Sequence, residues 1–268
     1  MFRPIYLFLF VPIALLISQT GLAQDIIPQR TLPELKEETL KRIQEKPQRS
    51  MVEGILVEDA KAALGNLKSL DRDEWASVWM VYGDKYMTEA KALQAKGDPT
   101  AKDMYLRANK YYKLAHYPTD NSPKKKEAYK KGLDAFLQYA SYLKPKLEVV
   151  RIPFAGKEIV GYLRLPDGPR PVPLVYLVTA LDSRKEEWAV RNGIYLSQGI
   201  GIFVTDMPGT GQAPILGEPN AERMFSRVLD YFKTRQEIDY NRIAFYGEAQ
   251  IVLYRLGRLS CSVKSILL

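Results

Sequence analysis

The stretch AFYGEAQIVLYRLG, residues 244–257, decides how the second half of the chain folds. Residues 242–246 form a short, nearly continuous apolar run, which is typical of a buried strand, and Gly247 interrupts it. Beyond the glycine, apolar residues recur at helical spacing from Ala249 to Leu259. The pattern predicts a strand, a sharp turn and a helix, with Ala249 presented in the turn.

Further segments around this stretch have strand patterns of two kinds. Residues 172–178 and 201–206 are short apolar runs with helical segments between them, as in parallel strands that are covered on both faces. Residues 147–153 and 157–166 alternate like an antiparallel pair. With a last strand expected at 263–268, the chain has six predicted strands. The fold class is therefore α/β from residue 147 onward.

The region from residue 24 to residue 146 has a helical pattern almost throughout. Asp71 and Asp73 are expected to cap a helix that runs to Lys96, and Ser122 with Pro123 begins a later one. Aromatic residues recur at spacings of three and four in this region, and packing between helices explains them better than a ligand site. They are Trp75, Trp79, Tyr82 and Tyr86. We expect a separate helical domain over 24–146 and a second domain over 147–268.

The first 23 residues resemble a secretory signal peptide. Arg3 precedes an apolar run over residues 5–17, and small residues end at Ala23, where cleavage is expected. The run contains Pro12 and is shorter than the roughly 20 residues that span a bilayer. A permanent membrane anchor is the weaker alternative, and the mature chain is expected to be secreted or periplasmic.

The formal charge of the 268-residue chain is +8, but the basic residues are dispersed among acidic ones. The only tight run is Lys124-Lys125-Lys126, which is interpreted as a solvated helix start rather than a nucleic-acid patch, so no nucleic-acid partner is expected. Cys261 is the only cysteine, so an intrachain disulfide is excluded, and a buried structural thiol is expected.

Three loops are expected at the carboxyl ends of parallel strands, where α/β sheets place their sites. They cover residues 179–182, 206–211 and 247–250. In the second loop, Pro214 stands where the third glycine of a dinucleotide motif belongs, so we predict a tight structural turn and no cofactor. A helix was also expected to begin with Ser183 and Glu186 at capping-box spacing and to carry Trp188 and Tyr195.

Few side chains near these loops are suited to catalysis. Asp206 and Glu248 could act as an acid–base pair, but we expect them to be solvated or capping carboxylates, which is the more ordinary role. His116, the only histidine, ends a helix, where a cation or polar cap is its ordinary role. No metal-ligand set was recognised, and no metal is expected.

Five motifs, taken in order, carry a resemblance to a known family. The sequence resembles the α/β-hydrolase family that includes fermentation-respiration-switch-like esterases and pseudo-oxynicotine hydrolase, over about residues 51–248. The resemblance implies a helical cap ahead of a serine-hydrolase core, with hydrolysis of acyl or carbon–carbon bonds. The motifs are SLDRDEW (69–75), ANKYYKLAHYP (108–118), IPFAGKEIVGYLRLPDGPRPVPLV (152–175), LDSRKEEWA (181–189) and TDMPGTGQA (205–213).

The sequence departs from this family where the chemistry should lie. A nucleophile motif G-x-S-x-G is present only as GEAQI, residues 247–251, with Ala249 in place of the serine. If 263–268 is the sixth of eight strands, the acid and the histidine that activate a serine are absent as well. We therefore expect an incomplete core and an inactive site. The backbone N–H groups of Ala180, Leu181 and Gln250 would remain as an oxyanion site by resemblance.

Two other functions stay open at this point. In the first, the chain is a non-enzymatic protein that binds a small acyl or aromatic ligand between cap and core. In the second, it is a helical interaction module in which only the cap carries the function. The apolar strand 263–268 is expected to be an open edge, so self-association through it is also predicted.

Overall fold

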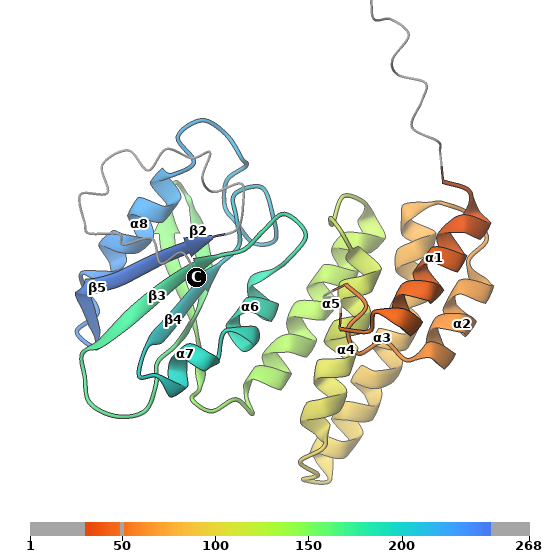
Figure 1. Cartoon of the computed structure of the whole chain (residues 1–268), viewed down its shortest axis with the longest axis horizontal. Coiled ribbons are helices and arrows are strands. Elements are labelled where there is room, and N and C mark those ends of the chain that lie inside the picture. The colour runs from red at the N-terminus through yellow and green to blue at the C-terminus, as the bar shows by residue number, and fades with distance from the viewer. Residues whose placement is uncertain (1–29, 49–50, 248–268) are drawn as a thin grey trace, which may run out of the picture.

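The computed structural model describes residues 30–48 and 51–247, which form a helical cap and a sheet domain side by side (Figure 1). The cap contains five helices: α1 (Leu32–Glu45), α2 (Val57–Asn66), α3 (Arg72–Ala95), α4 (Ala101–His116) and α5 (Pro123–Ala140). This agrees with the helical region predicted upstream of residue 147. Within the described ranges, no helix is long and apolar enough to cross a membrane.

The long helices of the cap pack through the predicted aromatic stripe. Trp79 and Tyr86 are buried, and the Tyr111 ring of α4 lies against both, with ring centroids 6.4 and 5.2 Å away. Close approach of α3 and α4 depends on Gly83, because a Cβ there would lie 2.5 Å from Cδ1 of Tyr112. The aromatic residues of this stripe therefore form a packing core, as predicted.

The helix starts in the cap confirm one expected cap and correct two details. The Asp71 carboxylate accepts hydrogen bonds from the backbone N–H groups of Asp73 and Glu74, each at 2.9 Å, as an N-cap should. The second expected cap of α3, Asp73, instead accepts from Lys124 N–H at 2.9 Å and so caps α5. Ser122 occupies the N-cap position of α5, but its side chain makes no capping bond.

The sheet has the order β1-β2-β4-β3-β5, which confirms the α/β fold class. The hairpin β1–β2 is antiparallel, β2 pairs antiparallel with β4, and β3 lies between β4 and β5 in parallel. The strand expected at 263–268 lies outside the described residues. The strands are β1 (Leu147–Phe154), β2 (Lys157–Arg164), β3 (Val172–Val178), β4 (Gly201–Thr205) and β5 (Ile238–Gly247).

The two faces of the sheet are covered differently. Helix α8 (Arg223–Phe232) packs its aromatic side chains on one face, where Phe232 lies edge-on against Phe203 with ring centroids 4.9 Å apart. The other face is covered by α6 (Lys185–Arg191), by α7 (Ile194–Ser197) and by the cap, whose Phe136 stacks on Tyr162 at 5.3 Å.

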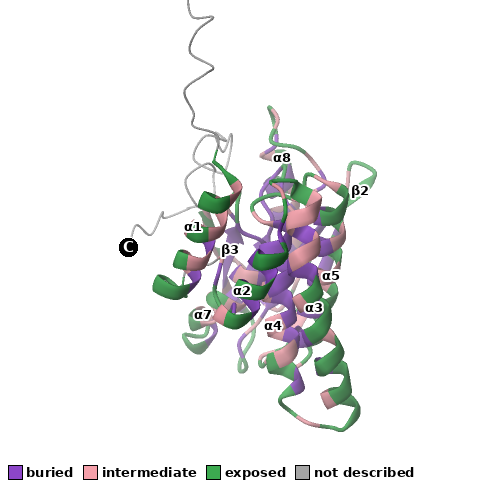
Figure 2. Cartoon of the chain, turned by 90° about the vertical axis from the view of Figure 1, so that its right-hand side faces the viewer, coloured by how far each residue is buried: buried purple, intermediate pink, exposed green. Residues whose placement is uncertain are grey.

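Buried hydrophobic side chains of the described residues form clusters inside the cap, between α8 and the sheet, and between the sheet and the cap with α6 and α7. Figure 2, seen from the cap side, shows exposed residues over much of α1 and at the far ends of α3 and α4. The cap therefore closes directly over one face of the sheet, beside the strand ends.

Candidate active site

The carboxyl ends of the three parallel strands lie level at one edge of the sheet. Val178, the last residue of β3, pairs with Thr205 at the end of β4 on one side and with Gly247 at the end of β5 on the other. The loops that follow β3 and β4 therefore start next to each other, with Gly247 of β5 beside the first of them. This is the edge at which an α/β sheet places its site.

The loop after β3 contains the two predicted oxyanion donors Ala180 and Leu181, of which one is occupied. The N–H of Ala180 donates to Ser183 Oγ at 3.0 Å. The N–H of Leu181 has no acceptor among the described residues, and its side chain is exposed. Of the predicted oxyanion donors, only Leu181 is thus open to a ligand within this part of the chain. The third, Gln250, lies outside the described residues, as do Glu248 and Ala249.

The helix after this loop does not begin with the predicted capping box. Helix α6 starts at Lys185, and neither Ser183 nor its neighbour Arg184 makes a side-chain capping bond to it. The acceptor is Asp206 from the loop after β4, whose Oδ1 accepts the Lys185 N–H at 2.9 Å. The two strand-end loops are joined at the start of α6. Tyr195, expected in the same helix, lies in α7.

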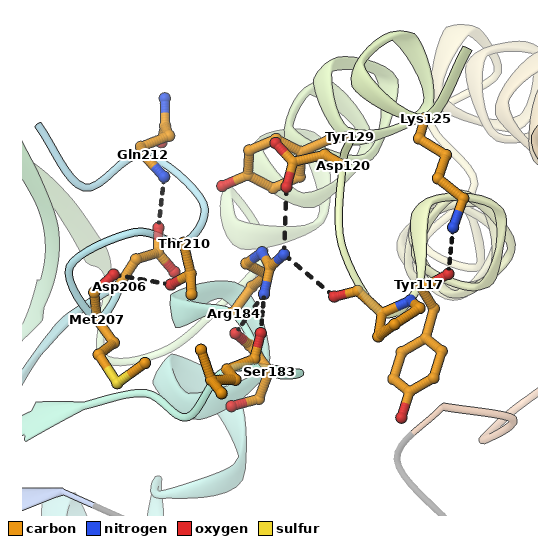
Figure 3. Close-up of polar contacts among 12 residues, drawn as sticks. Tyr117, Asp120, Lys125, Tyr129, Ser183, Arg184, Asp206, Met207, Thr210 and Gln212 are labelled. Atoms are coloured by element: carbon orange, nitrogen blue, oxygen red, sulfur yellow. Dashed lines mark hydrogen bonds and ion pairs between the residues drawn. The ribbon is translucent and has the colours of Figure 1, made fainter. Parts of the chain in front are cut away.

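Asp206 is buried and has hydrogen bonds to both carboxylate oxygens. Its Oδ2 accepts from the backbone N–H of Gln212 and from Lys185 Nζ, each at 2.9 Å. The first of these bonds closes the loop on itself, and Thr210 Oγ1 donates to Met207 O at 2.9 Å within the same turn (Figure 3). The predicted tight structural turn is present. The suggested pairing of Asp206 with Glu248 stays a prediction, because Glu248 lies outside the described residues.

The ammonium group of Lys185 is fully buried between two carboxylates. It lies 2.9 Å from Asp206 Oδ2 and 2.8 Å from Glu186 Oε1. Burial favours the neutral amine, but the two carboxylates outweigh it and raise the pKa of Lys185 above its ordinary value. Burial also raises the pKa of Glu186, against the attraction of Lys185. This cluster holds the loops in place.

Sequence reasoning missed this cluster. Lys185 and Glu186 stand in a run of charged residues, SRKEEW, that reads as a solvated helix start. The signal that could have found them is the acidic residue at the end of a buried strand, Asp206, which needs a buried partner once the cap covers the site.

The cap reaches this edge through the first turn of α6 (Figure 3). Arg184 Nη2 donates to Pro118 O and to Asp120 Oδ1, both at 3.4 Å and both in the loop between α4 and α5. In the same turn, Glu187 Oε2 is paired with Lys113 Nζ at 2.5 Å. Both contacts join the cap to the loop region of the sheet domain.

Burial disfavours the cationic form of His116, which corrects the cation alternative of the two roles expected at this helix end, a cation or a polar cap. It is buried, and its ring lies edge-on against Tyr129 with centroids 5.1 Å apart. Burial, together with the positive charges of Arg184, Lys113 and Lys125, lowers the pKa of His116 to about 3. No acceptor or donor among the described residues bonds to its Nδ1.

Two cavities lie between the cap and the sheet domain. One, of about 400 Å³, lies between the turn after β4 and Asp120 of the cap, and Lys157 reaches into its wall. The other, of about 460 Å³, lies between the cap and α6 and is lined by Phe136, Val190 and Arg191 among others. Both are within the usual range of roughly 300 to 1,000 Å³ for small-molecule sites. No group of His, Cys, Asp and Glu suited to a metal ion occurs in the described ranges.

Comparison with known proteins identifies the same architecture. The family described as Esterase FrsA-like matches residues 61–263, so the match continues past residue 248, where the resemblance expected from the motifs ends. An α/β-hydrolase of Penicillium citrinum, gkaG, is 29% identical over 215 residues, which cover 73% of this chain and 50% of the relative. The 2,6-dihydropseudooxynicotine hydrolase of Paenarthrobacter nicotinovorans is 26% identical over 218 residues, 80% of this chain and 58% of that protein.

A solved structure agrees in fold. The crystal structure of 2,6-dihydroxy-pseudo-oxynicotine hydrolase superposes with a TM-score of 0.61 at 23% identity, over 73% of this chain and 55% of the solved one. The chain spans about half the length of the curated relatives it matches. The part matched by the family, residues 61–263, contains α3 to α5 of the cap and the strand-end loops described above.

Proposed function

The chain belongs to the FrsA-like esterase family, and from this membership we propose that its strand-end site binds a small acyl or aromatic ligand without hydrolysing it. The observation that carries the proposal is the register at the sheet edge. Gly247 ends β5 level with Val178, so the nucleophile position of G-x-S-x-G, two residues after this glycine, falls on Ala249.

The absence of hydrolysis follows from the side chain at that position. A serine attacks a carbonyl only when a base removes its proton, and a methyl group has neither a lone pair nor a proton to lose. The chain's single histidine, His116, is packed against Tyr129 in the cap and has a depressed pKa. His116 is therefore a structural residue of the cap.

Binding is supported by the open backbone donor and by a cavity between the cap and the sheet domain. The Leu181 N–H is the donor that we assign to the ligand's carbonyl oxygen, while Ala180 N–H is used by Ser183. The cavity between the cap and α6 offers Phe136 and Val190 as apolar surface. The alternative in which the cap acts alone is less favoured, because Phe136 of the cap is buried on the sheet domain.

Hydrolysis is tested with p-nitrophenyl acetate and p-nitrophenyl butyrate and with a fluorophosphonate probe followed by peptide mapping. We expect hydrolysis at the buffer rate and no adduct, both for the chain and for Ala249→Ser. An adduct on any side chain of the unaltered chain would refute the inactive site.

Binding is tested by calorimetry with 4-nitroacetophenone, an uncharged aryl ketone that cannot be hydrolysed. Leu181→Pro removes the N–H, and Leu181→Ala is the matched control that keeps it. We expect binding to be weakened about tenfold in the first variant, the effect of one hydrogen bond of about 1.4 kcal/mol, and to be unchanged in the second. Equal binding by both variants would show that this donor is not used.

A further inference from the structure

A third cavity, of about 340 Å³, lies within the cap, and Tyr117 in its wall donates a hydrogen bond to Asp182 of the loop after β3 at 3.4 Å. Its walls come from α1, the start of α3 and the Tyr117-Pro118 turn after α4. The volume is that of a site for a small organic molecule. None of the residues assigned above to the carbonyl ligand lines it.

The first notable wall residue is Lys125, the middle lysine of the run that sequence analysis assigned to a solvated helix start. Lys124 and Lys126 are exposed, but Lys125 is only 6% exposed. Its Nζ donates to Tyr117 O at 2.7 Å, a neutral acceptor (Figure 3). No carboxylate within the described ranges comes within ion-pair distance of this ammonium group, in contrast to Lys185, which has two.

The charges around Lys125 make the burial of its unpaired ammonium group more unfavourable. Burial and the nearby Arg72 guanidinium lower the pKa of Lys125, and the carboxylates of Asp120 and Asp73 oppose them only from longer range. A buried charge without a partner is costly, and a bound anion would remove that cost. The cavity therefore contains one cation that lacks a counter-ion.

The other charged side chains in the cavity wall do not compensate the positive charge of Lys125. Arg30 and Arg42 share a single carboxylate, Glu38. Asp71 is engaged as the N-cap of α3. The side chain of Arg72 is exposed and has no ion-pair partner in the part of the chain that the structure describes. The lining has four cationic side chains and two carboxylates, and both carboxylates are already occupied.

The remaining wall is apolar. The Trp75 indole N–H is bonded to Leu114 O at 2.9 Å, so the ring offers only its carbon surface to an occupant. Leu70, which is 51% exposed, and Met51 complete this wall. An occupant that covered these side chains would gain roughly 25 cal/mol per Å² of apolar surface removed from water.

We propose that this cavity binds a small amphipathic carboxylate, an aryl or short-chain carboxylic acid, with its carboxylate between Lys125 and Arg72 and its apolar body against Trp75 and Leu70. The charge excess selects an anion, and the apolar wall selects an organic one. The site goes beyond the proposed carbonyl site at the strand ends and does not depend on it.

The test uses the full chain and phenylacetate, with 2-phenylethanol and inorganic sulfate as the matched uncharged and non-organic probes. Calorimetry should show saturable binding of phenylacetate and at least about tenfold weaker binding of the other two, because each lacks one of the two contacts. Trp75→Phe should remove the fluorescence change on binding while calorimetric binding persists. Sulfate or the alcohol binding as tightly as phenylacetate would overturn the proposal, as would no saturable binding.

Variants locate the site. Lys125→Met and Arg72→Gln should each weaken phenylacetate binding about tenfold or more, while Lys126→Met, an exposed lysine on the same helix, should leave it unchanged. Arg72 is exposed, so this variant tests the site even if Lys125→Met fails to fold. Leu181→Pro should have no effect, which separates this site from the strand-end site. Equal weakening by Lys126→Met would reduce the result to net charge and overturn the assignment.

Discussion

The Asp206 carboxylate binds Lys185 twice, through the backbone N–H and through Nζ, and both distances are 2.9 Å. One side chain from the loop after β4 thus caps α6 and neutralises the first residue of that helix. Since Asp206 also accepts from Gln212 N–H, it fixes the loop after β4 and the start of α6 together.

Asp206→Asn should cost about 3 to 5 kcal/mol of unfolding free energy, because it removes one partner of a buried ion pair and leaves Lys185 with Glu186 alone. Urea unfolding followed by circular dichroism measures the loss. The control is Asp230→Asn, which breaks an exposed ion pair with Lys233 on α8 and should not change stability measurably. Equal small effects of both variants would contradict the role of Asp206.

Gly211→Ala should destabilise the same loop by about 2 to 5 kcal/mol, the sum of a backbone cost of about 1 to 2 kcal/mol and an overpacking cost of about 1 to 3 kcal/mol. The residue has φ +49°, and an added Cβ would lie 2.5 Å from Cγ of Asp206. Gly97→Ala is the matched control, since its φ is +71° but its surroundings are open, so only the backbone cost of about 1 to 2 kcal/mol remains. Thermal unfolding of the two variants should differ accordingly, and identical melting temperatures would refute the clash.

Two glycines in cap helices should respond with opposite sign to the same substitution. Gly83→Ala should destabilise by about 1 to 3 kcal/mol, because the new methyl group meets the Tyr112 ring. Gly65→Ala should stabilise by up to about 1 kcal/mol, because nothing lies within 4 Å and alanine favours the helix. Differential scanning calorimetry checks the signs; a gain in both would show that α3 and α4 are less closely packed than described.

His116 should make stability depend on pH below neutrality. Its pKa is about 3 in the folded chain and about 6.5 in an unfolded one, so between these values the unfolded state binds the extra proton. Its contribution is fully present above pH 6.5 and is lost as pH falls towards 3, by on the order of 5 kcal/mol in all. Urea unfolding from pH 7.5 to 4.5 should show this slope.

The matched variant for this measurement is His116→Phe, which keeps a ring against Tyr129 and removes the titration. Carboxylates contribute equally to both proteins, so only the difference in slope is informative. Because the chain has one histidine, no other imidazole adds to it. Parallel stability profiles for the two proteins would show that His116 is protonated in the folded state.

Local patterns predicted the elements well because they depend on neighbouring residues. Period-two alternation located β1 and β2, apolar runs located β3 and β4, and the Asp71 cap located the start of α3. The antiparallel and parallel halves of the sheet followed from the change in pattern at residue 147.

The candidate sites were less predictable because their side chains depend on partners far along the chain. Lys185 is buried because Asp206, 21 residues away, meets it, and Asp73 caps a helix that begins 50 residues later. Lys125 reads as solvent-exposed between two exposed lysines, and only the docking of the Tyr117-Pro118 turn covers it. The pattern of charges along the sequence does not show which of these distant residues come into contact.

Residues at the start of α6 that are close in sequence contact the cap and the sheet domain respectively. Arg184 and Glu187 bind the cap, and Lys185 binds Asp206. Adding or deleting one residue here would rotate the helix by about 100° and break both sets of contacts at once. Related sequences should therefore keep the spacing from Ser183 to Trp188 free of insertions, whereas the exposed turn at 97–100 is free to vary in length during evolution.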